Sequence, residues 1–332
     1  RKTYTCAGIY DDKHIPAYQR INDFLKSNGA VPAIQLGHSG RKGSCHDAIK
    51  DWAPLQPEDA ADGLAPWTAI APSAVPQTPA HPIPRAMTEE DIADVIQAFV
   101  DSTVRAAKAG YEIVEIHGAH GYLIHQFLSP LTNKRNDGYG GTRENRMRLA
   151  LEITRAVRAA WPDDKPLFYR LSAIDGPGGM WTIDDSIALA AALKDCGVDI
   201  VDCSAGGIVG SASKARLPRL PGFNVPFSQR IKQEAGVPTM AVGLITEGDQ
   251  AERILQSGQA DLIALARELM WYADWPAHMA RQMGVTDHRF MPDGYAHRLR
   301  LRDHQATMDI NQKTPENYAL LSELAGMTVT PD

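Results

Sequence analysis

The sequence predicts a (β/α)₈ barrel, or TIM barrel, of which six strands are evident. Amphipathic helices that end at glycine alternate with short, almost wholly apolar strands, a pattern typical of a parallel sheet covered by helices. A barrel assembles its active site from the C-terminal ends of several strands, whereas an open doubly wound sheet, the alternative, uses mainly one crevice. Six different strands carry a polar residue or glycine at or just past that end, namely Gln35, His117, Arg170, Ser204, Gly243 and Arg267. This distribution favours the barrel.

Six helix–strand units follow one another along the chain. In the second expected helix Thr88 is a suitable N-cap, acidic residues follow it, and Gly110 comes just after the last turn. The expected helices cover residues 17–29, 87–110, 144–161, 182–197, 226–236 and 246–259, and the expected strands lie within residues 30–38, 111–120, 165–173, 198–207, 237–245 and 260–269.

The strand count falls short of the eight that close a barrel. No convincing strand precedes Ala17, and the residues after Trp271 read as helix and loop. One long, Pro-rich connection at residues 37–86 interrupts the alternation of helices and strands. We expect it to cover or line a site at the catalytic end. We therefore predict a barrel domain over residues 1–300 that lacks its first two strands, followed by a polar C-terminal tail over residues 301–332.

Composition narrows the class of protein. The chain has 332 residues, 44% hydrophobic and 22% charged, which is ordinary for a globular protein. A net charge of −6 argues against a nucleic-acid or membrane-surface binder. The four cysteines show no CxxC spacing, so neither a zinc ribbon nor an iron–sulfur site is expected. Scattered cysteines, and the lack of any apolar run of about 20 residues, predict a cytoplasmic protein.

A long motif then indicates a family. The segment HGAHGYLIHQFLSPLTNKRNDGYGG, together with AIQLGHSGRK and ALARELM, resembles the old yellow enzyme family of FMN-dependent ene-reductases, and most of all its thermophilic-like bacterial subgroup. The resemblance extends to about Arg300. It implies FMN as cofactor, NADPH or NADH as hydride source, and a small α,β-unsaturated carbonyl compound as substrate. It also implies a homo-oligomer, dimer or tetramer, in which Arg298 is a candidate to reach a neighbouring subunit's site.

The same resemblance accounts for the missing strands. Family members carry roughly sixty more residues ahead of a segment like TYTCAGIY, and these residues supply the first two of the eight strands. They also supply a Pro-Met-containing motif beneath the flavin and, in this subgroup, a cysteine that tunes it, and neither motif is present here. We therefore expect the sequence to be part of a longer protein. A non-catalytic fragment that cannot hold flavin is an alternative.

The resemblance also implies the catalytic residues. His117 and His120 would donate hydrogen bonds to the substrate carbonyl oxygen, where charge develops as hydride arrives at Cβ. Tyr122 would deliver a proton to Cα, because a phenol stays protonated at neutral pH. A metal-dependent barrel hydrolase that uses the two histidines and an acidic residue is a second alternative. The HxxH pair lacks an obvious third ligand, so no metal site is predicted.

Other residues are implied to hold the cofactor. Gln35 offers an amide to the pyrimidine edge of the flavin, and Arg170 a cation to its N1 and O2 atoms. An unpaired arginine within a strand is costly, and a carboxylate from a neighbouring strand is the other partner open to Arg170. Gly243, Ala266 and Arg267 are implied at the phosphate, although family members commonly have glycine where Ala266 stands. Lys42 is expected at the entrance.

Overall fold

The structure is a computed structural model that describes residues 1–208 and 217–330. The chain divides into two compact units. The first comprises Arg1–Ile245 and Arg253–Leu265, and the second comprises Thr246–Glu252 and Ala266–Asp332.

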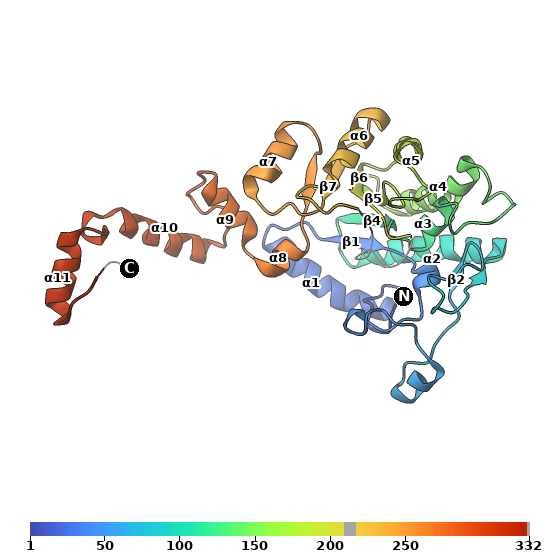
Figure 1. Ribbon diagram of the computed structural model, residues 1–332, viewed down its shortest axis with the longest axis horizontal. Coiled ribbons are helices and arrows are strands. Elements are labelled where there is room, and N and C mark those ends of the chain that lie inside the picture. The colour runs from blue at the N-terminus through green and yellow to red at the C-terminus, as the bar shows by residue number, and fades with distance from the viewer. Residues whose placement is uncertain (209–216, 331–332) are drawn as a thin grey trace. The chain divides into compact units, whose positions relative to one another are not determined.

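The first unit is built on one sheet of six parallel strands, in the order β1-β4-β5-β6-β7-β8 (Figure 1). The strands are β1 (Ala33–Leu36), β4 (Ile113–Gly118), β5 (Leu167–Ser172), β6 (Ile200–Ser204), β7 (Thr239–Val242) and β8 (Leu262–Ala264). Every neighbouring pair runs parallel. The sheet curls into a half barrel, and the six predicted strands are confirmed.

The register of the sheet brings polar side chains onto one face. Gln35 pairs with Glu115, and His117 pairs with Arg170. Arg170 in turn pairs with Asp202. Because successive side chains alternate between the two faces, the residues between them point the other way, toward the helices. That second face is apolar, and Val114, Ile116, Tyr169, Leu171 and Val201 on it are fully buried.

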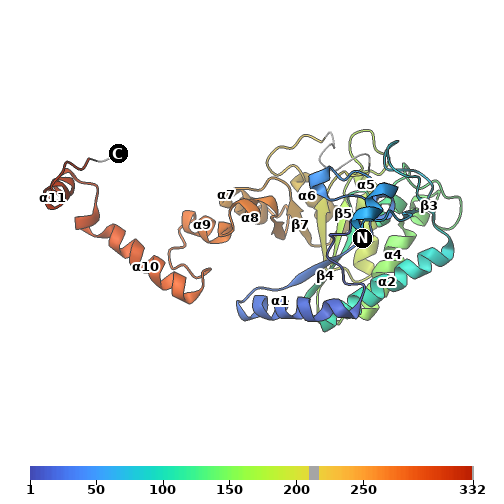
Figure 2. The same cartoon turned by 90° about the horizontal axis from the view of Figure 1, so that it is seen from below.

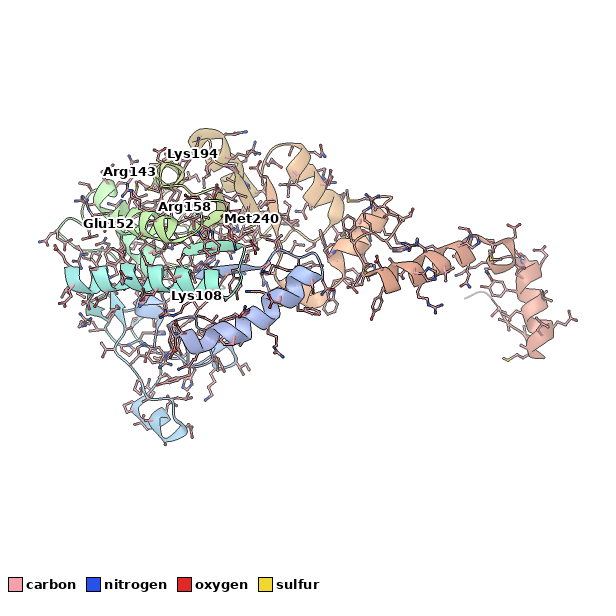
Figure 3. All side chains as sticks on the ribbon, turned by 180° about the vertical axis from the view of Figure 1, so that it is seen from behind. Lys108, Arg143, Glu152, Arg158, Lys194 and Met240 are labelled. Carbon is pink, nitrogen blue, oxygen red and sulfur yellow. The ribbon has the colours of Figure 1, made fainter. Side chains whose placement is uncertain are left out.

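Helices cover the apolar face, as Figure 2 shows for α2 and α4 beside β4 and β5. Figure 3 marks Arg143, Glu152 and Arg158 along α4, and Met240 on β7. The helices of this unit are α1 (Ile15–Ser27), α2 (Glu89–Lys108), α3 (Leu123–Leu128), α4 (Arg143–Ala160), α5 (Ile183–Asp195) and α6 (Val225–Ala235). A further helix, α7 (Gly248–Gln256), runs through the boundary between the units.

Threonine caps fix where three of these helices begin. The Thr88 hydroxyl accepts a hydrogen bond from the Asp91 N–H, and the Asp91 carboxylate accepts one from the Thr88 N–H, a reciprocal capping box. Thr182 forms the same box at α5, and Thr142 caps α4. Gly110 follows α2 with a φ of 80°, so both signals predicted for that helix are confirmed.

The long connection contains structure that its sequence did not predict. Two short strands, β2 (Ile70–Ala71) and β3 (Arg85–Ala86), pair in parallel within it. Each strand has only two residues, which is too short to show an alternating pattern. The many prolines nearby also argue against strands, because proline donates no hydrogen bond to a ladder. The segment also contains short 3₁₀ helices, of which Gly40–Lys42 is buried.

The second unit is helical. Its helices are α8 (Arg267–Trp271), α9 (Trp275–Gln282), α10 (Asp293–Thr307) and α11 (Pro315–Ala325). The Trp275 indole N–H donates to the Thr246 carbonyl oxygen at 2.7 Å, which holds two segments of this unit together. Helix α10 runs through residue 300, and the domain boundary expected there stays a prediction. None of the helices in the described ranges has the length and apolar character needed to cross a bilayer.

Candidate active site

The chain reverses sharply after β4, and this turn brings three ring side chains together. His120 and Gly121 are successive left-handed residues, with φ of 58° and 69°. The ring centroid of His117, on β4, lies 5.2 Å from that of His120 and 5.3 Å from that of Tyr122, the N-cap residue of α3. In a continuous strand, residues three positions apart point to opposite faces, so His117 and His120 could not share one side. The turn brings them to the same side.

Three polar contacts hold His120 in its strained conformation. Its N–H donates to Ser172 Oγ at 2.9 Å, and its carbonyl oxygen accepts from Lys42 Nζ at 2.7 Å. Its ring nitrogen Nε2 lies 2.7 Å from Ser204 Oγ. A left-handed residue with a side chain costs about 1–2 kcal/mol, so it needs such surroundings to persist.

Burial keeps both imidazoles neutral. It lowers the pKa of His117 to about 3, and the positive charge of Arg170 contributes next. It also lowers the pKa of His120 well below the usual value. Burial raises the pKa of Tyr122, so its phenol keeps the proton at neutral pH. The three rings therefore present neutral N–H and O–H groups. The Nδ1 atom of His117 is buried and has no hydrogen-bond partner among the described residues.

Lys42 does not line an entrance, and that expectation is wrong. Its side chain is buried, and Nζ donates to the carbonyl oxygens of His120 and Gly207 at 2.7 and 2.6 Å. Burial, followed by the charges of Lys2 and Arg41, lowers the pKa of Lys42 to about 7. Lys42 thus joins the turn after β4 to the loop after β6.

Both residues expected at the flavin ring already have a polar partner. Gln35 Nε2 donates to Glu115 Oε1 at 2.5 Å. Arg170 Nε lies 3.1 Å from Asp202 Oδ2, so the neighbouring-strand carboxylate left open by the sequence is present. Asp202 is buried, and its burial raises its pKa to about 7 even though Arg170 favours the charged form. Sequence reasoning did not name Glu115 or Asp202 as these partners, although each is the one acidic residue of its strand.

The residues expected at the phosphate belong to different units. Gly243 follows β7 in the first unit with a φ of 126°, and a side chain there would press on Phe223 and Asn224. In the second unit Ala266 is the N-cap residue of α8, and Arg267 is its first, exposed residue. Their role at a phosphate stays a prediction.

The first unit contains a cavity of about 940 Å³, within the size range of small-molecule sites. Its lining includes Gln35 and His38 of the β1 segment, His117, Tyr122, and Trp52 of the long connection. Two of the three clustered rings thus face a space large enough for a ligand.

Metal-binding side chains do not gather here. Across residues 1–208 and 217–330, no three His, Cys, Asp or Glu side chains are grouped so that they could hold a metal ion. Within these residues no third ligand stands beside the HxxH pair, and the hydrolase alternative is not favoured.

Known proteins resemble this chain in sequence over most of its length. Residues 2–285 match the NADH:flavin oxidoreductase / NADH oxidase family. The NADPH dehydrogenase of Geobacillus thermodenitrificans is 44% identical over 279 residues, which are 84% of this chain and 74% of that protein. The NADPH dehydrogenase of Halalkalibacterium halodurans is also 44% identical over 279 residues, 84% of this chain and 75% of that protein.

Solved structures share the fold. A 2-naphthoyl-CoA reductase in complex with 2-naphthoyl-CoA superposes with a TM-score of 0.72 at 26% identity, over 86% of this chain and 43% of that one. Morphinone reductase in complex with tetrahydroNAD superposes with a TM-score of 0.65 at 23% identity, over 84% of this chain and 72% of that one. From the family match and the identities of its relatives, the chain belongs to the NADH:flavin oxidoreductase / NADH oxidase family, the old yellow enzyme family, and is an FMN-dependent NAD(P)H oxidoreductase.

Proposed function

We propose that this protein is an ene-reductase, which reduces the C=C bond of small α,β-unsaturated carbonyl compounds with NADPH or NADH. The observation that carries this proposal is the cluster of His117, His120 and Tyr122. The ring centroid of His117 lies 5.2 Å from that of His120 and 5.3 Å from that of Tyr122, and the rings of His117 and Tyr122 line the cavity. A pair of neutral N–H donors beside one phenol suits a reaction in which an oxygen gains charge while a carbon gains a proton.

The residues of the sheet fit FMN. Buried polar atoms are almost always paired in proteins, so the unpaired Nδ1 of His117 indicates a partner outside the described chain. Arg170 is half-buried on the same face and would supply a cation to the electron-rich N1 and O2 edge. Gln35 would turn its amide from Glu115 to the pyrimidine ring. Bound FMN supplies the hydride chemistry, and the protein orients and polarises the substrate.

Two proposals concern the phosphate, one in each unit. Gly243 in the first unit would let the backbone approach it closely, since glycine alone adopts its φ of 126° without strain. Arg267 in the second unit would fork onto phosphate oxygens, with Ala266 contributing its backbone.

The chain's own residues would then carry out two tasks. His117 and His120 donate to the carbonyl oxygen, which orients the substrate and stabilises the enolate as hydride reaches Cβ. Tyr122 passes its O–H proton to Cα, and solvent returns a proton to the tyrosinate. The products are the saturated carbonyl compound and NADP⁺ or NAD⁺, so two electrons and two protons balance.

The assembly and location are further parts of the proposal. We infer a cytoplasmic homo-oligomer, dimer or tetramer, in which Arg298 on α10 reaches the site of a neighbouring subunit. Light scattering on the purified protein measures its mass, and a monomer at working concentration would contradict the oligomer.

The proposed activity has a simple test. We expect purified protein to be yellow, to lose its flavin absorbance when NADPH is added under nitrogen, and to regain it when 2-cyclohexenone follows. Mass spectrometry should then find cyclohexanone. A protein that binds FMN and is bleached by NADPH, but is reoxidised only by oxygen, would contradict the ene-reductase proposal while leaving the family assignment intact.

A further inference from the structure

The turn that presents the clustered rings is held from behind by a fully buried histidine. The N–H of Gly121 donates to the Nδ1 atom of His125 at 2.9 Å. His125 lies on α3, one turn beyond Tyr122, and its side chain has no solvent exposure. Gly121 is bonded to both His120 and Tyr122, so this one hydrogen bond restrains the backbone on either side of it.

The hydrogen bonds around His125 fix which of its nitrogens carries the proton. Nδ1 accepts from Gly121, so it holds no proton, and the proton must be on Nε2. Nε2 lies 2.9 Å from Asp175 Oδ1 and donates to it. The ring is therefore neutral and in a single tautomer, set by the carboxylate on its far side.

Asp175 is itself held by the loop that follows β5. Its Oδ2 atom accepts from Ser129 Oγ at 2.7 Å and from the N–H groups of Met180 and Trp181 at 3.0 and 2.9 Å. Burial alone would raise the pKa of this carboxyl group, but the hydrogen bond from His125 and those from Trp181 and Ser129 hold it below the usual value. The carboxylate thus stays charged and orients His125.

Two successive left-handed residues make this support necessary. His120 and Gly121 both have positive φ, and such a turn persists only where its surroundings over-determine it. A side chain at position 121 would collide with the Gly207 carbonyl oxygen, so the backbone there has no room to adjust.

We propose that the Asp175–His125 pair is a positioning device for the proton donor: through the N–H of Gly121 it holds the turn that aims Tyr122 and His120 at the substrate. This inference rests on the proposed function, and it assigns His125 a positioning role, not a catalytic one, because its ring is enclosed within the protein. A displacement of about 1 Å in such a turn is enough to slow chemistry about 100-fold.

Two substitutions at His125 separate its two contacts. In His125→Asn the amide oxygen takes the place of Nδ1 and can accept from Gly121, but the side chain is too short to reach Asp175. In His125→Gln the amide reaches toward Asp175 and leaves no acceptor for Gly121. Thr154→Ala is the matched control, because it removes a buried side-chain hydrogen bond within α4 that touches neither His125 nor Asp175.

The measurement is stopped-flow kinetics of the two half-reactions in FMN-loaded enzyme, with flavin content and melting temperature recorded for each variant. We expect His125→Gln to slow reoxidation by 2-cyclohexenone about 10- to 100-fold, with reduction by NADPH unchanged. His125→Asn and Thr154→Ala should reoxidise close to the wild-type rate, even where they melt earlier. Equal reoxidation in His125→Gln and His125→Asn, or equal slowing of both half-reactions, would overturn the proposal.

A second variant tests the same contacts if neither His125 variant folds. In Asp175→Asn the amide oxygen must stay on the three donors from Ser129, Met180 and Trp181, so the amide nitrogen faces His125. Nε2 then becomes an acceptor and the ring proton moves to Nδ1, where it opposes the Gly121 N–H. Nitrogen-15 NMR of labelled histidine should show an Nε2–H tautomer in the wild type and an Nδ1–H tautomer in Asp175→Asn. An Nδ1–H tautomer in the wild type would overturn the inference.

The two proposals fail in different ways. A wild-type enzyme that no enone reoxidises overturns the proposed function, and this inference with it. A wild-type enzyme that an enone reoxidises, beside a His125→Gln variant that is equally fast, overturns this inference alone.

Discussion

The Nε2 atom of His120 lies 2.7 Å from the Oγ atom of Ser204, although the two residues are 84 positions apart in sequence. Ser204 ends β6, whereas His120 belongs to the turn after β4. Because this contact engages Nε2, the other ring nitrogen of His120, Nδ1, is the one that remains to bind a substrate. A hydroxyl on a rigid strand therefore fixes the orientation of the imidazole that we propose binds the substrate carbonyl oxygen.

Removing that hydroxyl should loosen the ring. We expect Ser204→Ala to slow reoxidation of reduced enzyme by 2-cyclohexenone about tenfold, because the imidazole can then rotate away from the carbonyl oxygen. Ser204→Thr keeps the hydroxyl and should stay near the wild-type rate. Stopped-flow absorbance of the flavin measures both, and equal rates for the alanine and threonine variants would contradict the role of this contact.

The buried His117 should make the fold sensitive to acid. Its pKa is about 3 in the folded protein and near 6.5 in the unfolded chain, so between these values only the unfolded chain binds the proton. Stability therefore falls as the pH drops below 6.5. We expect His117→Asn to lose less stability than the wild type between about pH 7 and about pH 4, measured by urea unfolding. An equal loss in both proteins would show that His117 does not contribute.

Gly121 is required for two reasons that a pair of variants can separate. Its φ of 69° strains any other residue by about 1–2 kcal/mol, and a side chain there also collides with Gly207. Gly141 has a similar φ of 78° but open space around it. We expect Gly141→Ala to lose only the strain energy in urea unfolding, and Gly121→Ala to lose clearly more. Similar losses would show that the loop after β6 moves to make room for the side chain, which would contradict the collision with Gly207.

Lys42 should contribute to the stability of the fold. Its Nζ donates to two carbonyl oxygens that methionine cannot satisfy, so Lys42→Met should lower the free energy of unfolding by about 1–3 kcal/mol. Lys134→Met is the control, since Lys134 is exposed and donates to Pro130 in a surface loop. Urea unfolding of the two variants gives the comparison. A Lys42 variant as stable as the Lys134 variant would contradict this account.

The sequence predicts the scaffold well because its signals are local. Thr88 and Gly110 mark the two ends of α2 through hydrogen bonds within a few residues, and the structure places both as expected. The gathering of His117, His120 and Tyr122 follows from the glycines between them, which permit the turn.

Partners from distant strands escape such reasoning. The sequence predicts Lys42 at the entrance of the site, yet it is buried against carbonyl oxygens 78 and 165 positions away. Asp175 lies in a Gly-rich segment that predicts only a loop, and its contact with His125 spans 50 positions. Only the packing of one strand-end loop on another brings these groups together, and no local pattern encodes it.

The role of Tyr122 has the most direct test. We will compare wild type with Tyr122→Phe, which keeps the ring and removes the hydroxyl group that carries the proton, in rapid mixing of NADPH-reduced enzyme with 2-cyclohexenone. The account predicts reoxidation at least tenfold slower in the variant, with unchanged flavin content and unchanged reduction by NADPH. Reoxidation at the wild-type rate would show that the proton comes from elsewhere and would contradict the proposed site.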